Sequence, residues 1–225
     1  MLNQLKFFYS YILQSLDLKY LKGFSYKNII VAAPTGVAAI NAEGVTLHSL
    51  FQLPFTPFIP SNNTKENTLK RHSLLSQIRY NIKKRKILVN MDLLVIDEIS
   101  MVAANTLDAI DIILKGIRKN YEQPFGGVQV LFIGDLHQLP PVVKRDQIDI
   151  FRSIYDSIYF FDSYVLKKYP PVIVELKKVF RQNNDVFVDI LNGIRDNNLS
   201  KKNLLLLNKC LNPSFFPKDN EGYIT

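Results

Sequence analysis

The sequence contains little cysteine, glycine or proline and no long apolar run. One cysteine, nine glycines and eleven prolines occur among its 225 residues. A single cysteine excludes an internal disulfide framework and a Cys-based zinc cluster, and we expect Cys210 to be a small buried residue near a leucine run. No stretch approaches the ~18 uncharged apolar residues of a membrane-spanning helix. The composition therefore favours a soluble, intracellular globular protein without a membrane partner, cytoplasmic if the source is a bacterium.

Positive charge is concentrated in one short segment, which we expect to form one or two helices. The formal net charge is +8, and residues 65–86 hold eight Lys and Arg against one acid, Glu66. A concentrated basic stripe is the electrostatic footprint of a protein that binds a phosphate backbone. A solvated helix face with no ligand is the alternative, and charge alone leaves both open.

Three short apolar runs, at 28–33, 92–97 and 128–133, indicate buried strands. Helical patterns separate these runs, and the alternation predicts right-handed crossovers and a parallel sheet. Ligands of open parallel sheets bind at the carboxyl ends of the strands. We therefore expect a site on that edge, formed by the polar pairs that follow the three runs: Pro34-Thr35, Asp97-Glu98 and Gly134-Asp135.

The remaining segments carry weaker signals. Residues 3–22 show a mostly helical apolar pattern interrupted by charges, which indicates a helix rather than a signal peptide. Further along, the sequence predicts a strand at 172–176, a helix at 185–195 and a short helix around 204–207. Residues 223–225 have the composition of the start of another strand.

The second apolar run delivers two adjacent carboxylates, Asp97 and Glu98, in the arrangement called Walker B. In that arrangement the first acid holds Mg²⁺, usually through water, and the second polarises the attacking water. An acidic pair that caps the helix after Ser100 is the structural alternative.

The third run leads into a loop stiffened by Pro140 and Pro141. Its Gln138 offers a neutral donor and acceptor suited to sensing a γ-phosphate or the attacking water, although a plain turn is the alternative. With no second His or Cys nearby, we interpret His137 as a surface or packing residue. Further along, Arg181 has the chemistry to stabilise charge on a phosphate across a cleft, and a surface ion pair is its alternative.

Six strings of the sequence together resemble Pif-type DNA helicases, which are RecD-like motor proteins of superfamily one. The strings occur in the family's order and span about residues 29–196: APTGVAAIN (33–41), GVTLHS (44–49), LVIDEISMV (94–102), FGGVQ (125–129), GDLHQLPPV (134–142) and VFRQ (179–182). The resemblance implies an α/β fold with a RecA-like P-loop NTPase core, in which helices flank a parallel sheet. It implies a first motor domain over 1–169 and the beginning of a second RecA-like domain over 170–225.

The resemblance also implies an activity and a nucleotide site. Members of this family are ATP-dependent DNA helicases that use ATP and Mg²⁺ and move 5′ to 3′ on single-stranded and forked DNA. They serve repair, recombination or telomere maintenance. By resemblance we expect this protein to act as a monomer. By position, Asp97 matches the metal-binding acid and Glu98 the catalytic one. Gly134, Gln138 and Arg181 match nucleotide-contacting positions, and the last two are also catalytic.

A further match concerns DNA. Thr35, Gly36, Thr46 and His48 match the motif that lies along single-stranded DNA in the family. The residue types are compatible with that role, since small residues let a sugar-phosphate backbone approach and Thr and His donate to phosphates. A helix start packed for structural reasons is the alternative. Three phenylalanines in the following loop are candidates for base stacking or for covering the core: Phe51, Phe55 and Phe58.

One family motif is missing. The sequence has no Gly-Lys dipeptide, and so no Gly-x-x-x-x-Gly-Lys-Ser/Thr loop to hold phosphates. We expect the chain to be the middle of a helicase that starts just after this loop and stops before the family's last motifs. A short, catalytically inactive DNA-binding remnant is the main alternative, and a different P-loop ATPase is a weaker one.

Overall fold

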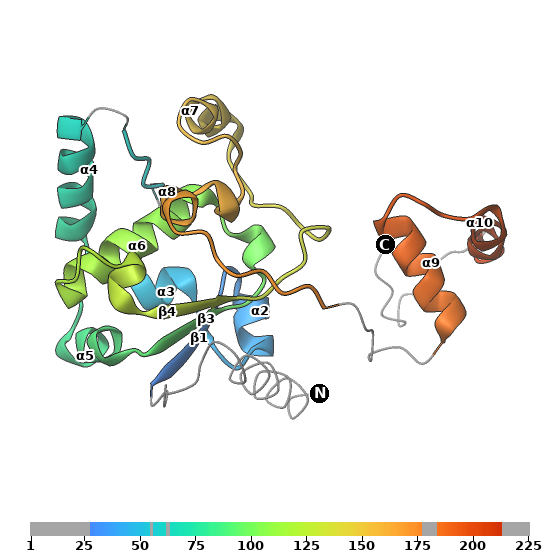
Figure 1. The fold of residues 1–225 in the computed structure, drawn as a ribbon, viewed down its shortest axis with the longest axis horizontal. Coiled ribbons are helices and arrows are strands. Elements are labelled where there is room, and N and C mark those ends of the chain that lie inside the picture. The colour runs from blue at the N-terminus through green and yellow to red at the C-terminus, as the bar shows by residue number, and fades with distance from the viewer. Residues whose placement is uncertain (1–27, 55, 62–63, 177–183, 213–225) are drawn as a thin grey trace, which may run out of the picture. The chain divides into compact units, whose positions relative to one another are not determined.

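A computed structural model describes residues 28–54, 56–61, 64–176 and 184–212 (Figure 1). The predicted helix at 3–22, the start of a strand at 223–225 and Arg181 lie outside the described residues. The chain forms two compact units that divide between Val172 and Ile173, and each is described by itself. The proposed identity of the second unit as part of another RecA-like domain stays a prediction.

The first unit is built on a parallel sheet with the strand order β2-β1-β3-β4. The strands span Ile29–Ala33 (β1), Val45–Thr46 (β2), Leu93–Ile96 (β3) and Gln129–Phe132 (β4). Ile29 pairs with Leu93, and Leu93 pairs with Gln129, so the strands start level with one another. The three strands predicted from the apolar runs and their parallel pairing are confirmed. The two-residue β2 is too short to give a sequence pattern and was not predicted.

Helices flank this sheet, as an α/β fold requires (Figure 1). In the first unit they span Gly36–Asn41 (α2), Leu47–Phe51 (α3), Thr64–Gln77 (α4), Ile82–Asn90 (α5), Ala104–Arg118 (α6), Ile148–Arg152 (α7) and Tyr164–Lys168 (α8). Short 3-10 turns lie at Ile99–Met101 (η1), Pro124–Gly127 (η2), Arg145–Gln147 (η3) and Phe160–Asp162 (η4). The basic segment therefore forms two helices, α4 and α5, as the sequence predicts.

The core of the first unit lies between β3 and α6. All four residues of β3 are buried, and one apolar cluster joins Leu94 and Ile96 to Leu107 and Ile110 of α6. Because a strand between two paired neighbours is covered on both faces, an uninterrupted apolar sequence is what β3 needs. The chain thereby brings the end of β3 to the middle of the sheet edge.

Two predictions for the second half of the chain are wrong. Residues 172–176 form no strand, and Val172 and Ile173 are 67% and 86% exposed, because no neighbouring strand pairs with them in the described part of the chain. Cys210 is exposed rather than buried. It follows α10 (Lys201–Asn208), which packs against α9 (Asp185–Arg195) in the second unit. No helix among the described residues is long and apolar enough to span a membrane.

Candidate functional site

The carboxyl ends of the strands meet as the sequence predicts for a parallel sheet. The Asp97 N–H donates to the Ala32 carbonyl at 2.9 Å, and the Ile99 N–H donates to the Ile133 carbonyl at 3.0 Å. Ala33 pairs with Thr46 on the other side of β1. The residues that follow β1, β3 and β4 therefore lie along one edge, with the threonines toward β2 and Gly134 toward β4.

The acidic pair has an unusual backbone. Glu98 lies in the left-handed region (φ 51°, ψ 45°), and the Asp97 carboxylate accepts a hydrogen bond from the Glu98 N–H at 3.0 Å. The helix that follows Ser100 is α6, whose N-cap is Ala103 without a side-chain capping hydrogen bond, and the Glu98 side chain does not cap η1 either. The pair therefore does not act as the helix cap that was the structural alternative. A non-glycine residue in the left-handed region costs about 1–3 kcal/mol, and active sites are one of the places where such residues cluster.

Gly134 follows β4 in close contact with η1. A Cβ at Gly134 would lie 3.0 Å from the backbone nitrogen of Ile99 and 3.3 Å from that of Ser100. The Ser100 hydroxyl oxygen is buried and makes no hydrogen bond with any residue that the structure describes. Because a Cβ would crowd the two backbone nitrogens, position 134 needs a glycine for the loop after β4 to lie against the turn that follows Asp97 and Glu98.

The loop after Gly134 is held by Asp135. Its carboxylate accepts from the His137 N–H at 2.9 Å and from the Gln138 side-chain amide at 3.4 Å, and its carbonyl accepts from the Gln138 N–H at 3.1 Å. His137 and Gln138 are exposed. The exposure of His137 fits the expectation of a surface residue.

Both threonines predicted to contact DNA begin helices. The Thr35 hydroxyl oxygen accepts from the Ala38 N–H at 3.2 Å, and that of Thr46 accepts from the Ser49 N–H at 3.1 Å. Each hydroxyl keeps its own hydrogen to donate, so the capping role and a phosphate contact are compatible. A Cβ at Gly36 would meet none of the described residues within 4 Å, so this part of the structure leaves the surface beside Thr35 open.

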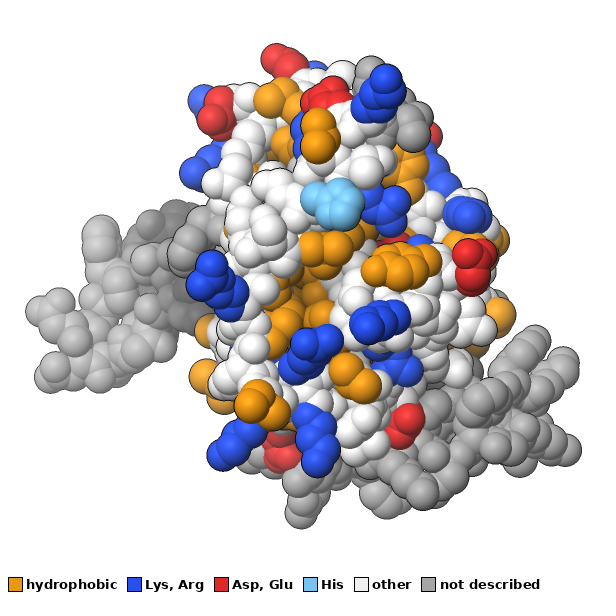
Figure 2. Space-filling model, turned by 90° about the vertical axis from the view of Figure 1, so that its left-hand side faces the viewer, with side chains coloured by type: hydrophobic (Ala, Val, Ile, Leu, Met, Phe, Trp, Pro, Cys, Tyr) orange, Lys and Arg blue, Asp and Glu red, His pale blue; other side chains and the backbone are white. Residues whose placement is uncertain are grey.

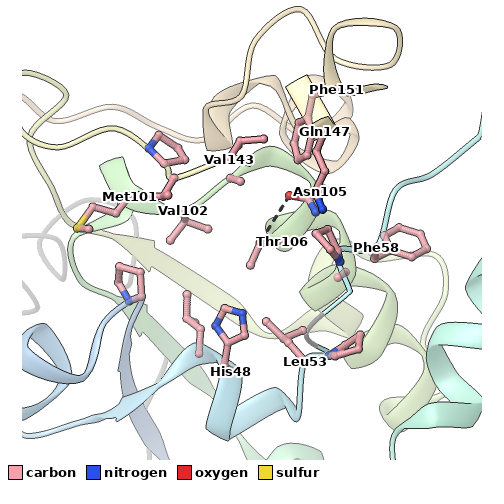
Figure 3. Close-up of a pocket in the computed structure, with 18 of the residues that line it drawn as sticks. His48, Leu53, Phe58, Met101, Val102, Asn105, Thr106, Val143, Gln147 and Phe151 are labelled. Atoms are coloured by element: carbon pink, nitrogen blue, oxygen red, sulfur yellow. Dashed lines mark hydrogen bonds between the residues drawn. The ribbon is translucent and has the colours of Figure 1, made fainter. Parts of the chain in front are cut away.

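A cavity of about 270 Å³ is lined by Thr35 and by Leu47 and His48 of α3. Figure 3 shows His48 and Leu53 on one side and Val102, Asn105 and Thr106 on the other. Of the phenylalanines considered for base stacking, Phe58 lines this cavity, whereas Phe51 is fully buried in the core and Phe55 lies outside the described residues. The stacking interpretation of Phe51 is therefore wrong, because its ring has no exposed face.

The basic residues of α4 and α5 lie over one side of the first unit, where Figure 2 shows Lys and Arg among apolar side chains. Part of this charge has a structural use. Lys70 forms an ion pair with Glu66 at 2.9 Å, and Lys84 donates to the carbonyl of Ser49, which ties α5 to α3. Arg71 and Arg79 are exposed.

The sequence reasoning missed a line of buried polar residues on α6. Asn105, Asp108 and Asp111 are 4%, 5% and 6% exposed. The Asp108 carboxylate accepts from the Tyr155 hydroxyl at 2.9 Å and from the N–H groups of Tyr164 and Val165 at 3.1 and 3.0 Å. Burial raises its pKa to about 6, against the lowering effect of these hydrogen bonds. The sequence does carry a signal for them, because the three polar residues recur at every third position of a helix that is mostly apolar.

Comparisons with known proteins identify the family. The family model for PIF1-like helicases matches residues 8–204. The ATP-dependent DNA helicase PIF1 of Saccharomyces cerevisiae is 38% identical over 184 residues, and that of Homo sapiens is 34% identical over 166 residues. These matches cover 81% and 74% of this chain but 19% and 23% of the relatives.

Solved structures agree with the sequence comparisons. A crystal structure of Pif1 helicase from Bacteroides with ADP-AlF3 and single-stranded DNA superposes with a TM-score of 0.75 at 43% identity, covering 92% of this chain and 45% of that one. A structure of two coordinating Pif1 helicases on forked double-stranded DNA has a TM-score of 0.71 at 45% identity, with coverage of 85% and 43%. The chain spans less than half the length of these relatives. On this evidence it belongs to the PIF1-like helicase family.

Proposed function

We propose that the chain is part of an ATP-dependent DNA helicase that couples ATP hydrolysis to movement along single-stranded DNA and to unwinding of forked DNA. The observation that carries this proposal is the shared sheet edge, which brings the acidic pair after β3 beside the threonines that begin α2 and α3. The names of the relatives and the nucleotide and DNA in the related structures support it. Movement from 5′ to 3′, action as a monomer inside the cell and a role in repair or recombination are part of the proposal by family.

The nucleotide half of the site is assigned to the ends of β3 and β4. Asp97 would hold Mg²⁺ and Glu98 would polarise the attacking water, while Gly134, Gln138 and Arg181 would contact ATP. The donor set fits, because Mg²⁺ keeps most of its waters and is held by one or two carboxylates plus substrate phosphates rather than by a protein cage. Mg²⁺, when bound, supplies positive charge that offsets the charge on the transferring phosphoryl group.

The DNA half of the site is assigned to Thr35, Gly36, Thr46 and His48. The hydroxyl hydrogens of the two threonines and the exposed imidazole of His48 are donors for phosphate oxygens. The open surface at Gly36 gives room for the sugar-phosphate backbone. Because such contacts carry no base information, this half of the site binds without strong sequence preference.

A second candidate function rests on the sequence. No Gly-x-x-x-x-Gly-Lys-Ser/Thr loop occurs among the 225 residues, so these residues by themselves lack the backbone cradle for the β- and γ-phosphates. For the 225-residue chain alone we propose weak binding of single-stranded DNA with negligible ATP hydrolysis.

Two assays test both candidates. Fluorescence anisotropy with a labelled single strand should show affinity that falls with salt, with a log–log slope of about −0.7 per phosphate contact. Phosphate release from ATP should stay at background for the 225-residue chain and become DNA-dependent in a longer chain that includes the phosphate loop. DNA binding that ignores salt would contradict the assigned phosphate contacts. Release by the short chain that disappears in Glu98→Gln would contradict the proposed inactivity.

A further inference from the structure

We infer that the cavity between α3 and α6 binds a single nucleobase of the DNA strand that passes over Thr35 and His48. This inference rests on the proposed function, because it takes the strand's path along the sheet edge as given. It adds a base-binding subsite, formed mainly by residues that the nucleotide and DNA motifs do not include.

The cavity has the size and the walls for one flat ring. Its volume of about 270 Å³ exceeds the ~150 Å³ of an engineered apolar cavity that binds benzene. Leu53 and Phe58 lie on one side, and Val102 and Val143 lie on the other (Figure 3). Pro57 also lines the cavity. Apolar and aromatic walls are what a base needs to stack, and every base presents a π-face to them.

Asn105 supplies the polar group of this cavity. It is only 4% exposed, and its carboxamide oxygen accepts from the Thr106 hydroxyl at a long 3.5 Å. Its amide nitrogen donates no hydrogen bond to any residue in the described part of the chain, although it carries two donors. Among the described residues only the Ser100 hydroxyl is both fully buried and without a partner, so the Asn105 amide nitrogen is accessible from the cavity. A ligand with a hydrogen-bonding edge would satisfy it.

The chemistry of the lining favours a base over a phosphate. No Lys or Arg is among the described residues that line the cavity, so an anion inside it would lack a counter-charge. A side-chain amide presents a donor and an acceptor side by side, which is the pattern that pairs with base edges. Because an amide can donate to or accept from any base, the subsite tolerates every sequence, as a translocating motor requires.

Two residues connect the cavity to the assigned DNA path. Thr35 and His48 belong to the lining of the cavity and also to the group assigned to the sugar-phosphate backbone. Figure 3 shows His48 directed toward the cavity from α3. A nucleotide whose phosphate contacts these residues therefore has the cavity beside it for its base.

The test compares an intact oligonucleotide with a fully abasic strand of the same length, each bound to the 225-residue chain in anisotropy titrations. The intact strand should bind about 5- to 150-fold more tightly, the range found for stacking of one base. Asn105→Leu keeps the branched shape of the side chain, replaces the amide by methyl groups, and should reduce this ratio without weakening the abasic strand. Asn90→Leu, on the exposed end of α5, is the matched control and should keep the ratio.

A second variant and a fluorescence readout show whether a reduced ratio comes from loss of the base contact or from misfolding of Asn105→Leu. Val143→Phe narrows the cavity without touching Asn105 and should reduce the ratio in the same way. A strand with 2-aminopurine should change its fluorescence on binding to the unaltered chain and not to Val143→Phe. Equal affinity for intact and abasic strands overturns the base subsite and leaves the proposed function standing. A ratio that survives both substitutions places the base contact elsewhere, and failure to bind either strand overturns the proposed function together with the inference.

Discussion

Asp108 gives a quantitative test of how α6 is joined to α8. Burial in this core raises its pKa from 3.8 to about 6, so the ionised carboxylate is less favourable in the folded chain than in the unfolded one. The carboxyl group therefore contributes stability that is fully present below pH 3.8 and is lost as the pH rises through about 6. A shift of this size corresponds to about 3 kcal/mol in the free energy of unfolding.

Asp108→Asn removes the ionisation and keeps the shape. The amide oxygen can still accept from the Val165 N–H, but the amide nitrogen cannot accept from the Tyr164 N–H, which adds a pH-independent cost of about 1–3 kcal/mol. Urea unfolding of both proteins measures the effect. Relative to the variant, the unaltered protein should lose about 2–3 kcal/mol of stability between pH 4 and pH 8.

The comparison isolates Asp108 together with its repulsion from the nearby Asp111 carboxylate, because the carboxyl groups that do not interact with Asp108 contribute equally to both proteins. Asp149→Asn, at an exposed position on α7, is the matched control, and its stability profile should run parallel to that of the unaltered protein. Parallel profiles for Asp108→Asn as well would refute the reasoning, since they would mean that burial does not disfavour the charge at this site.

Three further predictions follow from other contacts. In a chain that includes the phosphate loop, Glu98→Gln should keep nucleotide binding and lose most DNA-stimulated phosphate release, and unchanged release would contradict its catalytic role. Lys115→Met leaves the buried Asp111 carboxylate without its 2.7 Å partner and should lower the urea-measured stability by about 3–5 kcal/mol, whereas Lys86→Met on the exposed face of α5 should not. Gly126→Ala puts a Cβ 2.7 Å from a carbonyl oxygen of α6 at a φ of +63° and should lower Tm by at least about 2 °C; an unchanged Tm would show that the turn adapts.

Local patterning determined the sheet and its functional edge. The apolar runs that became β1, β3 and β4 are short and bounded by polar residues, and the uninterrupted apolar sequence of β3 matches its position between β1 and β4, where all four of its residues are buried. The position of Asp97 and Glu98 follows directly, because parallel strands end at one edge. The same reasoning failed at 172–176, where an apolar run interrupted by Glu175 pairs with no strand among the described residues.

Burial against distant segments was decided only by the tertiary structure. Asn105, Asp108 and Asp111 are spaced three apart on one helix and look alike in sequence, yet each meets a different environment: the cavity, the first turn of α8, and the 2.7 Å hydrogen bond from Phe125 in η2. The cavity itself is assembled from segments that lie as far apart as Pro34 and Phe151. A polar residue's role depends on which partner reaches it, and long-range packing sets that partner while local periodicity does not.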